Sequence, residues 1–480
     1  MENETQFDVA VVGGGTAGLM FARMMAEQDY SVLVIERKPQ EKVGDEYSAF
    51  HFDEERFNRY SLAKPQPGDA DYSARFEAGV YRSARGTHTC YSHCPNLLLK
   101  RAPFLRRMQA WAGEKGVEIR YQTTFTGFLL NKEGKINGIR CKNAADEYTV
   151  RARLTVDCSG KPAAARRQAP GEHIDTSGLT PRDLFYIYMH YAKLKYPEKD
   201  TVDAPIHYSQ WIGWIGQGER PGECIFGTSA SLSYEHAAKS YACFQREIPF
   251  PKHEEIRVEK GTTIYRRSPY SMVTDGFLCI GDAACMTKPF SGEGVTSGWV
   301  GCEIASRVAG KAMVNGAYPT KEALWEYNEL YAKGQGADFA YILAVMCNTA
   351  ASTPEENEYE FAHKIVFNDN NLTHCNIHYN YDAPITEVLP MLGRVFIGVV
   401  TGNIALNTLR AMLRGIVCAT RLKSHYKKYP RRPVGYARWT AKAEKLWRAV
   451  GSMADLADKA EATAAKAVKT VRLARAAVAK

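Results

Sequence analysis

Residues 7–37, FDVAVVGGGTAGLMFARMMAEQDYSVLVIER, constrain the fold of this 480-residue chain more than any other stretch. The stretch opens with an apolar, β-branched run, which predicts a buried strand. Gly13, Gly15 and Gly18 then complete a G-x-G-x-x-G pattern, and a glycine-free helical segment and a second apolar strand ending at Glu36 follow. This order is typical of a β-α-β unit that binds a dinucleotide.

Each part of this pattern has a physical reason. A glycine at position 15 leaves room for a pyrophosphate, and the carboxylate of Glu36 suits the hydroxyl pair of an unphosphorylated ribose. The alternative is a β-α-β unit whose turn is merely rich in glycine. The residues assigned to this part of a cofactor site are Gly13, Gly15, Ala17, Gly18, Glu36 and Arg37.

A second glycine-rich helix start, CIGDAACMTKPFSGEGVTSG, lies at residues 279–298. A plain NAD dehydrogenase has no use for it, whereas a flavin needs a second anchor for its ribityl chain and ring. The carboxylate of Asp282 suits a ribityl hydroxyl. Backbone N–H groups around Gly292, Gly294 and Val295, at the positive end of a helix dipole, suit an electron-rich flavin edge. No second dinucleotide pattern is found, so we expect FAD rather than NAD at this site.

Further motifs occur between the two loops. LTVDCSGKPAAARRQ at 154–168 is an apolar strand followed by a small-residue turn, and a run from Asn96 to Arg101 precedes a helical segment. Together with GDAA…PFSGEG at 281–294, these motifs resemble flavoproteins of the para-hydroxybenzoate hydroxylase type. Within that group, the chain is most similar to the geranylgeranyl reductase family.

The resemblance implies an FAD-dependent oxidoreductase that reduces carbon–carbon double bonds of a polyprenyl lipid, with Arg101 at the flavin site. It also implies an electron donor such as NAD(P)H or ferredoxin. The chain departs from the family because it has Tyr47 where many relatives have a cysteine, and because IHYSQWIGWIGQG at 206–218 lacks the F-P of the archaeal substrate motif. A flavin-dependent monooxygenase or halogenase is the alternative, and a non-enzymatic, membrane-bound flavin carrier is a third reading.

The predicted fold class is α/β, α+β overall. It has a Rossmann-like FAD-binding domain built from discontinuous segments, a β-rich substrate domain and a helical C-terminal region. The predicted divisions are 1–48, 95–164 and 262–310 for FAD, 49–94 and 165–261 for substrate, 311–430 for the helical region, and 431–480 for a basic helical tail.

Two residues are candidates for the proton donor that alkene reduction needs, Tyr47 and Lys288, one on each flank of the flavin. A solvated loop lysine is the plain alternative for the second. Four aromatic residues are candidates for an apolar substrate tunnel, although such residues are more often part of a core: Tyr208, Trp211, Trp214 and Phe290.

The segment HTCYSHC at 88–94 has poor spacing for a metal site, and we expect none. Twelve scattered cysteines in a chain whose first residues lack an apolar signal segment favour reduced thiols and a cytoplasmic protein. The longest uncharged run, 395–409, is too short to cross a bilayer.

The basic character of the chain is concentrated in its last part. Residues 421–480 hold 16 Lys and Arg against 4 Asp and Glu, a charge of +12, whereas the whole chain carries +9. Basic amphipathic helices bind membrane surfaces, so peripheral membrane contact through this tail is one reading and a solvated terminal helix is the other. Nucleic acid is not expected, because no binding module is recognisable.

Overall fold

The computed structural model describes residues 5–200, 202–349, 352–378, 385–456 and 458. Among these residues an eight-stranded sheet forms the centre of the molecule, in the order β17-β18-β11-β1-β2-β8, with β10 joined to β11 and β9 to β10. Its strands are β1 (Thr5–Val12), β2 (Val32–Ile35), β8 (Glu118–Arg120), β9 (Thr124–Leu130), β10 (Ile136–Lys142), β11 (Glu147–Asp157), β17 (Val273–Thr274) and β18 (Phe277–Cys279).

Strand β1 is central because its side chains are apolar on both faces. It pairs in parallel with β11 and β2, placing Val9 opposite Leu154 on one side and Val32 on the other. Helices α1 (Thr16–Ala26) and α5 (Val295–Ala312) pack against each other beside this sheet, although they lie far apart in the sequence. Strands from the three segments predicted to bind FAD therefore share one sheet, while the exact domain divisions stay a prediction.

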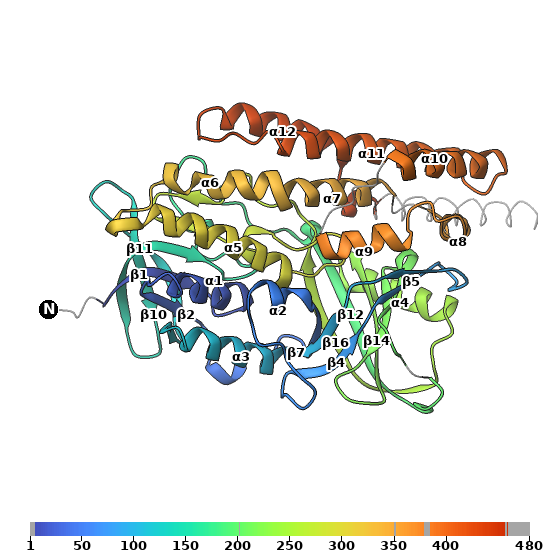
Figure 1. Cartoon of the computed structure of the whole chain (residues 1–480), viewed down its shortest axis with the longest axis horizontal. Coiled ribbons are helices and arrows are strands. Elements are labelled where there is room, and N and C mark those ends of the chain that lie inside the picture. Colours follow the sequence, from blue (N-terminus) through green and yellow to red (C-terminus); the bar gives the residue numbers. More distant parts are fainter. Residues whose placement is uncertain (1–4, 201, 350–351, 379–384, 457, 459–480) are drawn as a thin grey trace, which may run out of the picture.

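Two smaller sheets extend the molecule to one side of the central sheet (Figure 1). The seven-stranded sheet of the described residues consists of β16 (His253–Ile264), β12 (Leu184–Leu194), β15 (Glu223–Ser231), β14 (Gly213–Gln217), β13 (Ile206–Tyr208), β5 (Gly79–Arg82) and β6 (Thr89–Ser92), in that order. The three-stranded sheet consists of β3 (Ala49–Asp53), β7 (Asn96–Lys100) and β4 (Tyr72–Phe76).

Helices also occur where the sequence predicted mainly strands. In α4 (Tyr234–Glu247), the side chain of Ser233 accepts a hydrogen bond from the N–H of His236 at the first turn. Apolar residues at helical spacing, including Tyr241 and Phe244, are then buried against the seven-stranded sheet. Two further helices lie in the first part of the chain, α2 (Glu55–Arg59) and α3 (Arg101–Gly113).

Helices dominate after residue 311, as the sequence predicted. They are α6 (Lys321–Tyr331), α7 (Ala337–Thr349), α8 (Pro354–Ala362), α9 (Asp369–His378), α10 (Ile385–Val400), α11 (Leu406–Tyr426) and α12 (Tyr436–Val450). Figure 1 shows α10, α11 and α12 along one edge, with α6 and α7 between them and α5. The observed mixture of sheets and a helical C-terminal region confirms the predicted fold class. Within the predicted basic tail, residues 457 and 459–480 lie outside the described residues.

Candidate functional site

The glycines of the first loop are needed for two different reasons: some contact the protein backbone closely, and one faces an open cavity. Gly13 has a φ of 110°, and a Cβ atom there would lie 2.5 Å from the carbonyl oxygen of Cys158. A Cβ atom at Gly18 would lie 1.9 Å from the carbonyl oxygen of Gly13. At Gly15, by contrast, a Cβ atom would meet nothing within 4 Å, and the residue lines a large cavity. The space that a dinucleotide phosphate needs is therefore present at Gly15.

The acid after β2 is held in place by the backbone around it. The carboxylate of Glu36 accepts hydrogen bonds from the N–H of Gly14 at 2.8 Å and from that of Lys38 at 2.9 Å. It lines the same cavity at the carboxyl end of the strand. This fixed, partly exposed carboxylate is suited to accept hydrogen bonds from ribose hydroxyls.

The second glycine-rich loop packs directly against the first. Gly281 has a φ of 67°, and a Cβ atom at this position would lie 2.9 Å from the Cβ of Ala17. From α5, the indole N–H of Trp299 donates to the carbonyl of Thr16 at 3.2 Å. The thiol of Cys302 donates to the carbonyl of Ala17 at 3.3 Å. Two loops more than 260 positions apart in the sequence thus form one site.

Asp282 is partly buried and lines the cavity between the two loops. Burial raises the pKa of its carboxyl group, against the opposing effects of the Lys161 ammonium and a hydrogen bond from Thr287. Arg166 supports the loop, because its Nε donates to the carbonyl of Ala283 at 2.7 Å while its own backbone N–H donates to Asp157 at 2.6 Å. The loop that carries Asp282 is thus anchored by Arg166, and the nearby Lys161 ammonium favours the ionised form of the acid.

A single cavity of about 1290 Å³ connects these groups. The residues predicted to bind a cofactor that line it are Gly13, Gly15, Ala17, Glu36, Arg37, Arg101, Asp282, Gly292, Gly294 and Val295. Gly18 does not line the cavity, in keeping with its close contact to Gly13.

The N-terminus of α5 points its free N–H groups toward this cavity. Gly294 caps the helix without a side-chain hydrogen bond, and the first turn lines the cavity. The buried Oγ1 atom of Thr296 in that turn has no hydrogen-bond partner in the described part of the chain. An acceptor group of a ligand fits there, so the residues present fit the flavin end of FAD.

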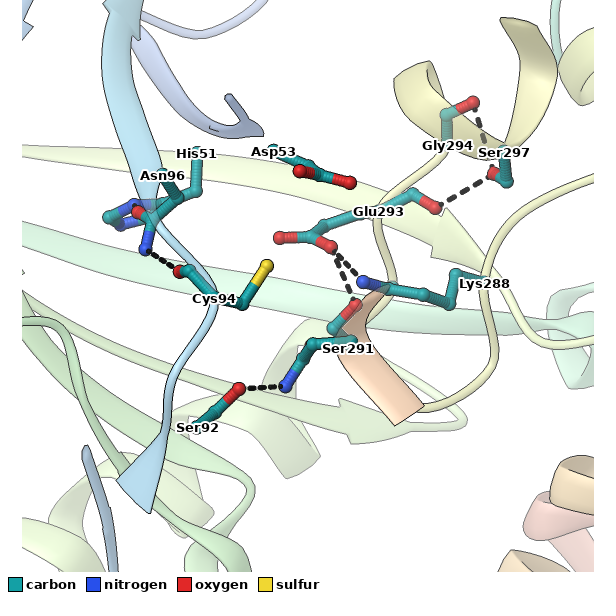
Figure 2. Close-up of polar contacts among 12 residues, drawn as sticks. His51, Asp53, Ser92, Cys94, Asn96, Lys288, Ser291, Glu293, Gly294 and Ser297 are labelled. Carbon is teal, nitrogen blue, oxygen red and sulfur yellow. Dashed lines mark hydrogen bonds and ion pairs between the residues drawn. The ribbon is translucent and has the colours of Figure 1, made fainter. Parts of the chain in front are cut away.

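An ion pair between a buried lysine and a partly exposed glutamate lies beside the helix start. The ammonium of Lys288, which is 3% exposed, contacts the carboxylate of Glu293 at 2.5 Å, and the hydroxyl of Ser291 donates to the same carboxylate at 2.9 Å. Figure 2 shows Lys288 and Ser291 pointing toward Glu293, with His51 nearby. Although burial alone would raise the pKa of Glu293, the Lys288 ammonium and these hydrogen bonds hold it below its usual value. Glu293 lines the cavity and Lys288 does not.

Tyr47 lines the cavity on another side. The guanidinium of Arg101 lies 4.2 Å from the centre of the Tyr47 ring. Burial raises the pKa of the Tyr47 phenol, and Arg101 opposes that shift. Of the two predicted proton donors, the structure therefore brings only Tyr47 to the cavity surface; Lys288 lies behind Glu293.

Of the four aromatic residues predicted to form a substrate tunnel, three line the cavity and one does not. Tyr208, Trp214 and Phe290 line the cavity. Trp211 does not, because its indole N–H donates to the carbonyl of Ala84 at 2.7 Å. Trp211 therefore belongs to the packing of the seven-stranded sheet.

Two histidines that sequence reasoning missed also line the cavity. Nδ1 of His51 lies 3.0 Å from Oδ1 of Asn96, and burial lowers the pKa of His51. The ring of His207 stacks on Tyr81 at 4.8 Å, and burial lowers the pKa of His207 to about 4. Both imidazoles are thus neutral at physiological pH. No local motif surrounds His51, whereas His207 lies in the segment 206–218 that the sequence analysis considered for its aromatic residues.

Lys161, Arg166 and Glu293 were also missed, although each lies inside a motif that the sequence singled out. Lys161 directly follows DCSG, Arg166 is one of the two arginines after it, and Glu293 is the acid of SGEG. Their charge at the edge of a predicted cofactor loop is the signal by which they can be found.

Beyond the loops, the cavity continues into an apolar region between helices of the C-terminal part. Side chains of α7, α10 and α11 form its wall: Tyr341, Ile342, Val345, Met346, Met391, Leu392, Val395, Leu409, Met412, Leu413 and Ile416. The lining changes from glycine, carboxylate and ammonium groups at one end to aliphatic groups at the other. One continuous cavity can therefore hold both a dinucleotide and an apolar ligand.

Comparison with known families identifies the cofactor. A family model described as an FAD binding domain matches residues 6–299. The chain belongs to this family. FAD is therefore its cofactor, and the chain is an FAD-dependent oxidoreductase, as its sequence predicted.

Similar curated proteins support the predicted resemblance to geranylgeranyl reductases. The chain is 21% identical to a digeranylgeranylglycerophospholipid reductase of Sulfolobus acidocaldarius over 462 residues, which cover 92% of this chain and 98% of that one. It is 25% identical to the protein of that name from Methanosarcina acetivorans, over 71% of this chain and 84% of the relative.

Solved structures share the fold. A geranylgeranyl bacteriochlorophyll reductase-like protein from Thermoplasma acidophilum superimposes with a TM-score of 0.68 at 16% identity, covering 83% of this chain and 99% of that one. A flavin-dependent brominase superimposes with a TM-score of 0.59 at 16% identity, covering 83% of this chain and all of the other. At this level of identity the likeness concerns the fold alone.

Proposed function

We propose that this FAD-dependent oxidoreductase reduces carbon–carbon double bonds in the polyprenyl chain of a lipid. The observation that carries the proposal is the continuity of the cavity from the cofactor loops to the aliphatic wall formed by α7, α10 and α11. A flexible apolar chain can enter such a space and exclude water from the reacting carbons. The curated relatives named digeranylgeranylglycerophospholipid reductase support the same substrate class.

The residues proposed to hold FAD are the predicted ones. Gly15 makes room for the pyrophosphate and Gly13 lets the loop pack closely against Cys158. Glu36 accepts from the ribose, while Asp282 accepts from the ribityl chain. The first turn of α5, at Gly294 and Val295, offers N–H groups and the positive end of its dipole to the flavin ring. Arg37, Arg101, Ala17 and Gly292 complete the proposed set, and Gly18 contributes only through its close packing against Gly13.

Saturating one double bond takes two electrons, delivered as a hydride, and one proton. When bound and reduced, FAD supplies the hydride. The proton must come from a group of the chain or from water, and the donor that reduces FAD is a nicotinamide nucleotide, a ferredoxin or a comparable carrier.

Tyr47 is the first proposed proton donor. Its phenol lines the cavity, and its raised pKa keeps it protonated over the physiological range. After it gives up the proton, the Arg101 guanidinium beside the ring stabilises the phenolate. Lys288 is the second candidate, but its ammonium pairs with the carboxylate of Glu293, so proton transfer from Lys288 would break this ion pair.

We also propose that the aromatic residues lining the cavity contact the polyprenyl chain of the substrate. Trp214, Tyr208 and Phe290 offer flat apolar surfaces to isoprene units. The three side chains come from the seven-stranded sheet and from the loop before α5.

Product analysis without oxygen tests the proposal. Enzyme whose FAD is reduced with dithionite is mixed under argon with a geranylgeranyl ether lipid, and the lipid is examined by mass spectrometry. The expected product has gained two hydrogens for each double bond reduced. An unchanged lipid under argon, combined with an oxygenated or halogenated product in air, would exclude the reductase and support the alternative oxygen-dependent class.

A further inference from the structure

The hairpin formed by α10 and α11 exposes an unusual amount of apolar surface. Half of the large apolar side chains that are exposed in the described residues belong to it: Leu389, Phe396, Ile397, Val400, Leu406, Leu413 and Val417. Phe396 is 66% exposed and Val400 70% exposed. Exposed apolar side chains that gather on one pair of helices often mark a binding site for a partner or a membrane.

These side chains lie on the exposed faces of the two helices. The opposite faces pack into a small core, in which Val395 of α10 and Met412 of α11 contact Ile365 and Ile404. Since α10 is apolar on both faces, its exposed face is not the polar surface that a solvated helix normally presents. Figure 1 shows the hairpin at an outer edge of the molecule, away from the central sheet.

The hairpin is also cationic. Residues 385–426 contain five Lys and Arg against one Glu, a formal charge of +4. Three of its arginines direct their recorded hydrogen bonds to neutral oxygen atoms: Arg394 to the carbonyl of His363, Arg410 to the amide of Asn407, and Arg414 to the carbonyl of Ala449. Their charge is thus available to anionic groups beside the apolar surface. Apolar side chains bordered by arginines complement the interface of an anionic phospholipid bilayer.

The inner face of the same hairpin forms a wall of the cavity. Met391 and Val395 of α10, and Met412 and Ile416 of α11, line it. Leu413 both lines the cavity and is 44% exposed, so the cavity wall and the outer apolar surface meet at this residue. Among the described residues no helix is long and apolar enough to span a bilayer, which leaves contact in the plane of the interface.

We propose that the α10–α11 hairpin docks the protein on an anionic phospholipid bilayer, and that a lipid chain enters the cavity beside Leu413. The docking stands on the hairpin alone, whereas the entry of a lipid rests on the proposed function. The proposal also moves membrane contact from the basic tail, where the sequence suggested it, to a structured pair of helices.

Co-sedimentation of the full-length, FAD-loaded protein with vesicles tests the docking. The protein should sediment with phosphatidylcholine vesicles that contain phosphatidylglycerol, and less with phosphatidylcholine alone. The double variant Phe396→Ser/Val400→Ser should weaken sedimentation about tenfold or more, because two buried apolar contacts with the bilayer are lost. Val434→Ser is the matched control, since Val434 is 88% exposed outside the hairpin and its variant should bind as the wild type does.

Equal FAD content and equal melting temperatures would show that the variants fold alike. Sedimentation of the double variant at the wild-type level, or no sedimentation of the wild type with either vesicle, would overturn the proposal. So would a wild-type dimer that the double variant converts to monomer, because the surface would then be an interface between two copies.

A second readout separates docking from the proposed function. The double variant should lose activity on lipid embedded in vesicles and keep it on lipid dispersed in detergent, since Phe396 and Val400 do not line the cavity. If the wild type binds vesicles but reduces lipid in neither form, the proposed function fails and the docking stands. Equal losses of the double variant's activity in both forms would refute the entry route.

Discussion

At the scale of single residues, the proposal that is easiest to test is Tyr47 as the proton donor. Replacing Tyr47 with phenylalanine removes the hydroxyl and keeps the ring against Arg101. Reduction of FAD should be unchanged, and re-oxidation by the lipid should slow by about 10²-fold or more, a typical loss for a general acid. Stopped-flow absorbance of the flavin measures both rates.

Tyr234→Phe is the control for this variant. Tyr234 also lines the cavity, but it lies at the start of α4, beside Lys260 of the seven-stranded sheet. Its re-oxidation rate should stay near that of the wild type. If Tyr47→Phe re-oxidises at the wild-type rate, the tyrosine is not the donor, and water becomes the simplest source of the proton.

Glu360 predicts a pH dependence of stability. Burial raises the pKa of this α8 carboxyl group to about 7 from 4.5, although Ser352 donates a hydrogen bond to it. The folded state therefore binds this proton more tightly than the unfolded state, and stability should fall as pH rises from about 4.5 through about 7. The shift corresponds to about 3 kcal/mol.

Glu360→Gln removes the titration and keeps a hydrogen-bonding side chain of the same size. Its melting temperature should rise relative to the wild type as pH increases between about 5 and about 8. Differential scanning fluorimetry across this range gives the comparison. A constant difference between the two proteins would mean that Glu360 is already ionised in the folded state.

At the scale of structural elements, the β1-loop-α1 unit gives a clean test of cofactor binding. A side chain at Gly13 or Gly18 would strike the protein's own backbone, but one at Gly15 would enter the open cavity. Gly15→Val should therefore weaken FAD affinity by about 100-fold or more while the apoprotein folds normally. Fluorescence titration of deflavinated protein with FAD measures the affinity.

Gly127→Val in β9 is the comparison, since a Cβ atom there also meets nothing within 4 Å and the residue lies away from the cavity. Both variants should give the circular dichroism of the wild type. Wild-type FAD affinity in Gly15→Val would remove this loop from the cofactor site.

The sequence predicted this element well because its information is local. The apolar runs, the glycine spacing and the acid at Glu36 all lie within one unit, and the loop at 281–294 repeats the same logic. Local patterns of this kind do not predict the directions in which the side chains of Trp211 and Lys288 point. Ile212 adopts a left-handed conformation with φ of 44°, so the chain turns between Trp211 and Trp214 and sends the two rings to different places.

Lys288 was misplaced for a related reason. The N–H of Lys288 donates to the carbonyl of Glu293, and the N–H of Gly292 donates back to the carbonyl of Lys288, each at 2.8 Å. This closed loop directs the lysine toward Glu293 rather than into the cavity. Hydrogen bonds between loop backbone groups depend on tertiary packing and leave no periodic pattern in the sequence.

At the scale of the whole molecule, the sequence predicted that the C-terminal region is helical but not that its helices line the cavity. Apolar and basic patterning predicted helices after 311, but the same pattern describes a helix that covers a core and one that lines a ligand cavity. Only the pairing of α11 with α7 shows that Ile342, Met346 and Met412 face a common space with the cofactor loops.

The central claim is that one cavity brings the cofactor and an apolar lipid into contact, and flavin re-oxidation tests it most directly. Dithionite-reduced enzyme is mixed under argon with the geranylgeranyl ether lipid in detergent, and the flavin absorbance is followed in a stopped-flow instrument. The account predicts that the oxidised spectrum returns at a rate that rises and saturates with lipid concentration, and that the fully saturated lipid has no such effect. A flavin that stays reduced with the unsaturated lipid and re-oxidises only when oxygen is admitted would contradict the account.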